Sequence, residues 1–426
     1  MNEEFLHYIW KYRLLNSDLR IHNGESLVIV DPGEHNRNAG PDFLNARVKI
    51  GSTLWAGNVE MHIHASDWFR HQHQFDSAYD NIILHVVHND DMPVRNGHNI
   101  PVPTLEIYDQ YPPEIFEKYE DFIGNHNWIP CEKLIHDTDP FHFIQWSPAL
   151  MTERLEDRCK RFAMTLENYA YDWDETFYFH LAHAFGFRIN ATPFEMLAHS
   201  LPLKILLKHK DNLFQLESLL FGQSGMLINN FSSEYPRQLD WEYQFLKHKY
   251  GLQPLNPSIW KFLRLRPSNF PTIRIAQLAM CIYQSKNLLA RVLHAESTSE
   301  LVNLFSVRAS DYWNDYFLFD KLSTHRHKIL GPASVHLLLL NLVIPFIFFY
   351  GDYRGISDYK EKGLQMLEEL PGEMNSELGH WKALGLPVFN AMQTQSLIQL
   401  KEKYCDLKKC LECRIGIQLL PPQNRS

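Results

Sequence analysis

The pattern of apolar and polar positions divides the chain near residue 130. Before that point it predicts one helix, "EEFLHYIWKYRLL", whose apolar residues recur at helical spacing. Five further runs are rich in β-branched and aromatic residues, are bounded by turn-forming residues, and are predicted strands: "SLVIVDP", "FLNARVKI", "TLWAGNVEMHIH", "NIILHVVHN" and "VPTLEIY". We therefore expect an α/β (α+β) domain over residues 1–130.

After the proline-rich "YDQYPPEIFEKYEDF", the pattern changes to long amphipathic segments. In "SPALMTERLEDRCKRFAMTLENYAY" and "NAMQTQSLIQLKEKYCDLKKC", apolar residues recur at intervals of three and four. This predicts a mostly α-helical domain over residues 139–426. The longest apolar run, "VHLLLLNLVIPFIFFY", has sixteen residues and contains Asn341 and Pro345. Since a membrane span needs about 20 largely apolar residues, we interpret this run as a buried, kinked helix.

Composition narrows the class of protein. The chain has 426 residues, of which 45% are hydrophobic, enough for two or three folded cores. Its start, "MNEEFLHYIW", has no basic region of the kind that begins a secretory signal, so we expect a cytoplasmic protein. Six cysteines in so long a chain do not form a secreted disulfide framework.

Candidate chemistry is concentrated in "NAGPDFLNARVKIGSTLWAGNVEMHIHASDW". A Gly-Pro turn places Asp42 at the start of one strand, and Glu60, His62 and His64 share one face of the next. Same-face side chains lie about 6.6 Å apart along a strand, close enough for two to bind one ion. Because neighbouring carboxylates repel each other, we expect Mg²⁺ or Mn²⁺ between Asp42 and Glu60. The alternative is a half-exposed sheet, whose solvated face shows the same alternation.

Asp42 after Pro41, followed by Glu60 on the next strand, resembles the core motif of the PD-(D/E)XK nuclease superfamily, which has the restriction-endonuclease-like fold. The resemblance covers about the first 110 residues, and the predicted order of helix and strands agrees with it. It implies that Asp42 and Glu60 bind the metal ion and that an acid of the first helix, Glu4 or Glu3, assists them. The whole chain also resembles a bacterial family of unknown function.

His62 occupies the position at which this superfamily has a lysine that orients or activates the attacking water. Histidine can act as a base near neutral pH, but it carries no permanent charge. Further histidines follow: His71, His73, His85 and His88. Neutral imidazoles suit Zn²⁺ or Mn²⁺, so these side chains are candidate ligands. For His71, His73 and His88 the pattern favours the alternative, which is packing around a short amphipathic helix.

Charge is distributed unevenly along the chain. The formal net charge is −9, yet residues 243–295 contain no Asp or Glu. Cations alternate with aromatic residues in "WKFLRLRPSNFPTIR", a mixture that suits phosphates and stacked bases. We predict a nucleic-acid-binding surface here, with four candidate contacts: Lys261, Arg264, Arg266 and Arg274. The alternative is that these cations pair with acids elsewhere in the chain.

Three cysteines in the C-terminal tail, residues 405–413, form a C-x4-C-x2-C pattern: Cys405, Cys410 and Cys413. A Cys-x2-Cys pair favours one metal, but a closed site needs a fourth ligand, for which a distant histidine and Cys131 are candidates. Zinc is the first candidate and an iron–sulfur cluster the second. Unliganded core thiols are the alternative.

These features predict a metal-dependent nuclease. An N-terminal nuclease-like domain would cleave DNA or RNA, and the helical domain would bind it, with no membrane involved. The alternative is a non-catalytic nucleic-acid-binding or scaffolding protein that retains a degenerate nuclease fold. The histidine in place of the lysine supports this alternative.

Overall fold

The computed structural model describes residues 1–421 apart from residues 229 and 286, and it divides into two compact units. The first unit contains Met1–Trp146, His380–Leu386 and Ile398–Ser426, and the second contains Ser147–Gly379 and Pro387–Leu397. The division after residue 146 lies close to the predicted domain boundary. The C-terminal segment differs, because it belongs to the first unit and not to the helical one.

Packing of the last helix explains this difference. Helix α18 (Arg414–Leu419) packs against the 3-10 turn η3 (Ile135–Asp137). The Tyr8 hydroxyl donates to the Ile417 carbonyl at 3.4 Å, and the Lys118 ammonium donates to the Leu419 carbonyl at 3.2 Å. Helical periodicity shows which face of a helix is apolar, but not which core covers that face.

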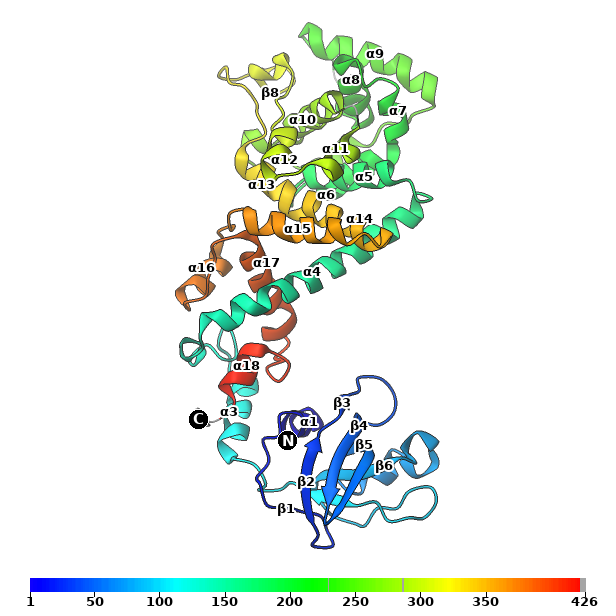
Figure 1. Ribbon diagram of the computed structural model, residues 1–426. Coiled ribbons are helices and arrows are strands. Elements are labelled where there is room, and N and C mark those ends of the chain that lie inside the picture. Colours follow the sequence, from blue (N-terminus) through cyan, green and yellow to red (C-terminus); the bar gives the residue numbers. More distant parts are fainter. Residues whose placement is uncertain (229, 286, 422–426) are drawn as a thin grey trace. The chain divides into compact units, whose positions relative to one another are not determined.

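A mixed sheet forms the centre of the first unit (Figure 1). Within the described residues the strand order is β1-β2-β4-β5-β6-β7, with β3 paired to β4. Pairs from β1 to β5 are antiparallel, whereas β5, β6 and β7 run parallel. The bounds are β1 (Leu19–Arg20), β2 (Ser26–Asp31), β3 (Glu34–His35), β4 (Phe43–Ile50), β5 (Thr53–His64), β6 (Ile82–Asn89) and β7 (Thr104–Glu106). The five predicted strands are confirmed.

Three helices accompany the sheet. Helix α1 (Glu3–Lys11) begins where the Asn2 side chain accepts a hydrogen bond from the Phe5 N–H at 3.1 Å. The ring of Phe5 packs against aromatic side chains around α3 (Pro113–Gly124), among them Tyr119 at 5.2 Å between centroids. Both α1 and the short α2 (Asp67–Arg70) pack against β5. The middle of β5 is therefore covered, and Val59, Glu60, Met61 and His62 are all buried.

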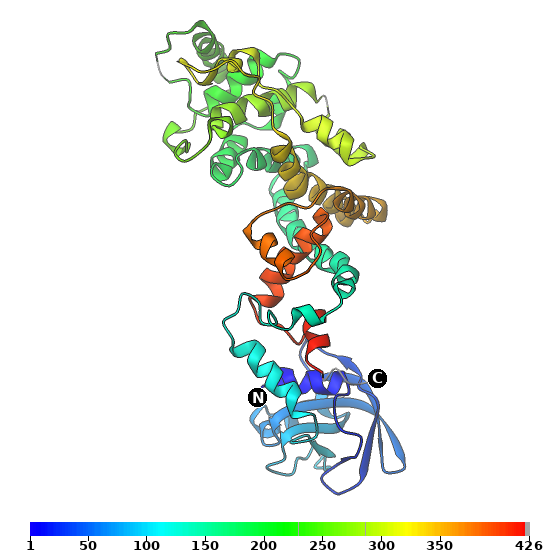
Figure 2. The same ribbon diagram turned by 90° about the vertical axis from the view of Figure 1, so that its left-hand side faces the viewer.

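The second unit is helical, as predicted (Figure 2). Helix α4 (Pro140–Asn168) begins in the first unit and continues into it. The other helices are α5 (Trp173–Phe185), α6 (Ala191–Ser200), α7 (Leu203–Leu207), α8 (Leu213–Gln223), α9 (Glu234–Tyr250), α10 (Pro271–Gln284), α11 (Leu288–His294), α12 (Thr298–Phe305), α13 (Pro332–Leu338), α14 (Ile344–Arg354), α15 (Ser357–Glu369), α16 (Ser376–Ala383) and α17 (Ala391–Leu400). A short hairpin, β8 (Tyr316–Leu318) with β9 (Lys321–Leu322), interrupts them.

The apolar run forms a continuous helix from Pro332 to Arg354, made of α13, a π-helical turn at Leu339–Val343 and α14. Among the described residues, this is the one helix long and apolar enough to cross a membrane, and 67% of its apolar window is buried in the structure. The predicted buried helix is confirmed. Its irregularity is the π-helical turn, which ends just before Pro345, a residue with no N–H to donate.

A buried carboxyl in the second unit leads to a pH-dependent prediction. Glu217 on α8 accepts hydrogen bonds from the hydroxyls of Tyr235 and of Ser310, the latter at 2.7 Å, and burial raises its pKa to about 7. The unfolded chain loses this proton near its ordinary pKa of 4.5, so stability falls as pH rises from 4.5 through 7. In wild type the free energy of unfolding should fall by an amount on the order of 3 kcal/mol over this pH range. Chemical denaturation should show that this fall is absent in Glu217→Gln. The exposed Glu234→Gln control should retain it.

Candidate metal centre

The two predicted acids meet where β4 begins beside β5. Asp42 follows a turn in which the Asn36 amide donates to the Pro41 carbonyl at 3.0 Å. The Asp42 N–H donates to Glu60 Oε2 at 3.1 Å, and Asp42 Oδ2 accepts from the Met61 N–H at 2.9 Å. Antiparallel pairing of β4 with β5, which includes a register shift after Phe43, thus holds both carboxyl groups in one place.

Electrostatic repulsion and burial act on this pair. Glu60 is 5% exposed, and burial followed by the nearby Asp42 carboxylate raises its pKa to about 9. The imidazole of His7, from α1, lies 3.3 Å from Asp42 Oδ2 through its Nε2. A divalent cation beside Glu60 would favour the ionised carboxylate, because an opposite charge offsets both the repulsion and the burial.

Three imidazoles extend the site beyond the acids. His62 Nε2 lies 3.1 Å from His71 Nδ1, and His73 Nε2 lies 3.3 Å from Glu60 Oε1. One ligand atom from each of His62, His71 and His73 lies within 4.8 Å of the other two. His71 is exposed, so the cluster reaches solvent on that side. Close nitrogen atoms and an adjacent carboxylate are a ligand set that suits a borderline transition metal.

The protonation of the imidazoles supports this reading. Burial, and then the neighbouring His85, lowers the pKa of His62 to about 2, and burial lowers the pKa of His73. Neutral imidazoles keep a lone pair for a metal. His62 Nδ1 lies 2.8 Å from His85 Nε2, so a His62 tautomer that donates to His85 presents its Nε2 lone pair to the cluster. His73 Nε2 is buried and faces Glu60 Oε1 at 3.3 Å without a well-aligned hydrogen bond, an arrangement in which both atoms could bind one ion. The residues present therefore fit a divalent metal.

The structure corrects the choice of helix acid. Glu3 is half-buried near the site: burial and then the Asp42 carboxylate raise the pKa of its carboxyl group, whereas His7 and His71 lower it. Glu4 is exposed and acts instead on Tyr119 of α3, because neighbouring helical residues point about 100° apart. Glu3 and His7 share a helix face through their spacing of four residues. That spacing is the signal in the sequence from which His7 could have been identified.

The outcome differs among the other predicted strand and histidine positions. Glu60 and His62 are buried, so the alternative of a solvated sheet face is wrong for them. His64 is exposed at the end of β5, and its Nδ1 lies 3.3 Å from the Asn89 amide. His88 packs against Tyr108 outside the cluster, as expected from the packing alternative. For His71 and His73 the packing alternative is incomplete, because one nitrogen of each lies within 4.8 Å of a His62 nitrogen.

The two acids of α1 allow a matched test. Glu3→Gln should weaken Mn²⁺ binding about tenfold, because it removes a negative charge that supports the cluster. Glu4→Gln should leave the dissociation constant unchanged. Isothermal titration of metal-stripped protein measures both variants. Equal affinities for the two variants would exclude Glu3 from the centre.

The predicted nucleic-acid contacts separate into two groups. Lys261, Arg264 and Arg266 are exposed between η4 (Pro257–Ile259) and α10. Arg274 is 4% exposed, donates to Gln277 Oε1 at 2.9 Å and lies 4.5 Å from the centre of a phenylalanine ring. Arg274 therefore stabilises the interior of the second unit and is removed from the proposed surface. Position 286, within the acid-free segment 243–295, lies outside the described residues.

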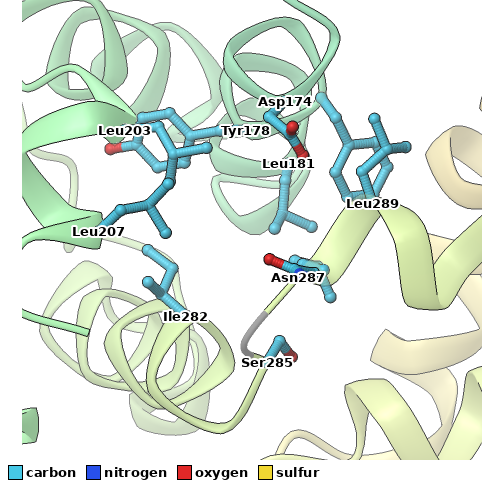
Figure 3. A pocket seen from close by; sticks show the side chains of 11 residues that line it. Asp174, Tyr178, Leu181, Leu203, Leu207, Ile282, Ser285, Asn287 and Leu289 are labelled. Atoms are coloured by element: carbon cyan, nitrogen blue, oxygen red, sulfur yellow. The ribbon is translucent and has the colours of Figure 1, made fainter. Parts of the chain in front are cut away.

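A cavity in the second unit provides a contrast to the metal centre. Its volume is about 80 Å³, and Figure 3 shows apolar side chains around it, including Leu181, Leu203 and Ile282. Asp174 contributes the one carboxyl group among its described lining residues, which include no histidine or cysteine. Nucleophilic or metal-dependent chemistry needs a second such group nearby, so the first unit contains the stronger candidate site.

A family model for proteins of unknown function, DUF2851, matches residues 3–376. The chain belongs to the DUF2851 family. The matched range includes both acids and all the histidines of the candidate metal centre, and it ends before the C-terminal cysteines. No curated protein and no solved structure matches the chain. DUF2851 membership confirms the predicted relationship to an uncharacterised family, while the function has to be argued from the site.

Proposed function

We propose that the first unit is a metal-dependent phosphodiesterase of the PD-(D/E)XK type and that it cleaves nucleic acid. The observation that carries this proposal is the convergence of Asp42, Glu60 and His62, the residue two places after Glu60, in one cluster in which Glu60 and His62 are buried. Support also comes from the element order α1, β2, β4, β5, α2, β6, with antiparallel pairing up to β5 and parallel pairing from β5 to β6.

The ligand set favours Mn²⁺ over Mg²⁺. Asp42 and Glu60 supply oxygen ligands, which both ions accept. His62, His71 and His73 supply nitrogen ligands, which suit Mn²⁺ and Zn²⁺, whereas Mg²⁺ prefers oxygen. When bound, the ion supplies Lewis-acid stabilisation of the charge that develops on the phosphate oxygens during hydrolysis.

The protein's own groups then have separate roles. Asp42 and Glu60 anchor the ion, and His85 orients His62 through the 2.8 Å contact between their rings. His62 acts as a metal ligand and does not take the role of the lysine in the PD-(D/E)XK superfamily, because its lowered pKa keeps it uncharged at neutral pH. Glu3 is the remaining carboxyl group that faces the site from α1, and its raised pKa suits proton transfer from water.

The second unit would hold the substrate. Lys261, Arg264 and Arg266 are exposed within a segment that contains no Asp or Glu. Such a cationic surface attracts phosphates without selecting a base sequence. The rival proposal is a protein that binds nucleic acid without cleaving it, and the uncharged His62 in the lysine position is the observation that favours it.

A cleavage assay distinguishes these two functions. Single-stranded and duplex DNA and RNA are incubated with the full chain and Mn²⁺, beside the double variant Asp42→Asn, Glu60→Gln. A nuclease loses at least a hundredfold in rate in the double variant and keeps its affinity for substrate. If neither protein cleaves any of these substrates and both bind nucleic acid equally well, the chain is a binding protein.

A matched pair tests the substrate surface. The triple variant Lys261→Gln, Arg264→Gln, Arg266→Gln should weaken nucleic-acid binding at low salt and reduce its salt dependence. Arg20→Gln, an exposed arginine of the first unit, serves as the control. Equal binding by the two proteins would exclude the segment as the substrate surface.

A further inference from the structure

Four of the six cysteines belong to the first unit and come from two distant parts of its sequence. Cys131 lies in the turn after α3, where its carbonyl accepts from the Leu134 N–H at 2.9 Å. Cys405, Cys410 and Cys413 lie between α17 and α18. All four are free thiols, and Cys131, Cys410 and Cys413 are buried. Because none of these thiols forms a disulfide, no covalent bond accounts for their grouping.

The C-terminal segment returns to the turn that contains Cys131. Figures 1 and 2 show α18 beside α3. The Lys408 ammonium donates to the carbonyls of Ile123 and Asn125, the latter at 3.2 Å, and Lys118 donates to Leu419. The Lys408 contacts join the end of α3 to the cysteine-containing segment, and the Lys118 contact joins the middle of α3 to the end of α18. Tertiary packing therefore brings Cys131 to the C-x4-C-x2-C pattern.

The four thiols influence one another. Besides burial, which is the largest cause, Cys413 and Cys410 raise the pKa of Cys131. The pKa of Cys405 is likewise raised, first by burial and then by Cys413, Cys131 and Cys410. Charges act on each other in this way only over short distances, so the four thiols lie near one another. The two remaining cysteines, Cys159 and Cys281, belong to the second unit, and no other thiol contributes to the shift in their pKa.

The backbone around Cys410 and Cys413 suits thiolates that bind a metal. The N–H groups of Ile415 and Gly416 hydrogen-bond to the Cys413 sulfur and favour its thiolate, although burial keeps the pKa raised to about 11. Gly416 also lies against the Cys410 backbone, since a side-chain carbon there would come within 2.2 Å of the Cys410 carbonyl oxygen. Close packing and N–H donors directed at sulfur are typical of metal–thiolate centres.

We propose that Cys131, Cys405, Cys410 and Cys413 form a tetrathiolate metal centre for an iron–sulfur cluster or a zinc ion. Four cysteines complete the ligand set of either group. Binding requires each thiol to release its proton to solvent, after which the metal neutralises the buried thiolates. The centre joins residues on both sides of the second unit in the sequence, so it closes the first unit around that insertion. This proposal is independent of the nuclease activity.

A zinc ion and an iron–sulfur cluster require different spacings of their sulfur ligands. Sulfurs on one tetrahedral zinc ion lie about 3.8 Å apart, given a Zn–S bond of about 2.3 Å. Among the described residues, no three cysteine sulfurs lie mutually within 4.8 Å, the spacing that the histidine cluster meets. A cluster of several irons separates its thiolates more widely than a single ion does.

Metal analysis of the full chain tests the proposal. The protein is purified without oxygen, and its iron, acid-labile sulfide and zinc are measured. About four irons with equal sulfide identify a cluster, and one zinc without iron identifies a zinc centre. Metal-free protein is then titrated with Co²⁺, whose thiolate charge-transfer bands report sulfur ligands. The proposal would be overturned by a protein that contains no bound metal after purification and shows no such bands after titration with Co²⁺.

Variants locate the centre. Cys131→Ala should lose at least nine-tenths of the thiolate-bound metal, whereas Cys159→Ala, which removes a buried thiol of the second unit, should retain it. Full retention in Cys131→Ala would overturn the four-cysteine assignment. Should Cys131→Ala fail to fold, a mercurial titration of native wild type replaces it. Metal release should then accompany the modification of four thiols, and release without thiol modification would contradict the proposal.

Discussion

Glu60→Gln is expected to abolish Mn²⁺ binding and at the same time to stabilise the metal-free protein above pH 7. Glu60 is buried beside Asp42, and these two causes raise its pKa from 4.5 to about 9. The unfolded chain releases this proton near pH 4.5, whereas the folded chain retains it, so folding stability falls as pH rises between these values. Glutamine has the same shape and no proton to lose.

The expected gain at pH 8 is several kcal/mol, since each unit of pKa shift corresponds to about 1.4 kcal/mol. Thermal unfolding of metal-stripped protein between pH 5 and 9 measures it. Mn²⁺ should raise the melting temperature of wild type most strongly at the upper end of this range and leave Glu60→Gln unchanged. The exposed Glu114→Gln on α3 is the control and should behave like wild type. A pH-independent difference between Glu60→Gln and wild type would contradict the assigned environment.

His62→Lys is the second substitution with a large expected effect, because it introduces the lysine that the PD-(D/E)XK motif has at this position. If His62 is a metal ligand, the lysine variant should lose Mn²⁺ binding and cleavage and should lose stability, because its ammonium would be buried beside His85 and His73. His62→Gln, which is neutral and of similar size, should lose metal affinity with a smaller loss of stability. Denaturant titration and Mn²⁺ calorimetry on both variants separate charge from ligation.

The opposite result has a definite meaning. Cleavage by His62→Lys at or above the wild-type rate, with Mg²⁺ as the ion, would show that position 62 performs the lysine's function. The assignment of His62 as a ligand would then be wrong. A further control is His64→Lys, because His64 is exposed at the end of the same strand and should tolerate the charge.

Local sequence determined the secondary structure of the first unit and the pairing of the two acids in its site. Alternation and turn residues delimited β4 and β5, and antiparallel pairing of two consecutive strands brings Asp42 to Glu60 without reference to any other part of the chain. Apolar periodicity likewise delimited α1. These features depend on side chains near one another in sequence, where the period of two or 3.6 residues decides which positions share a face.

Long-range packing decided the remainder. It selected Glu3 over Glu4, placed His71 and His73 beside His62, and buried Arg274 among polar partners in the second unit. A charge pattern cannot distinguish a solvated cation from a buried one, because both occupy polar positions of an amphipathic segment.

The same holds for the cysteines. The sequence contained the C-x4-C-x2-C pattern, but only the return of α18 to the turn after α3 brings Cys131 to it. Periodicity describes the face that an element presents, whereas the partner of that face depends on how the whole chain folds. Sequence by itself therefore determined the strands and the paired acids, and tertiary structure decided which side chains surround them.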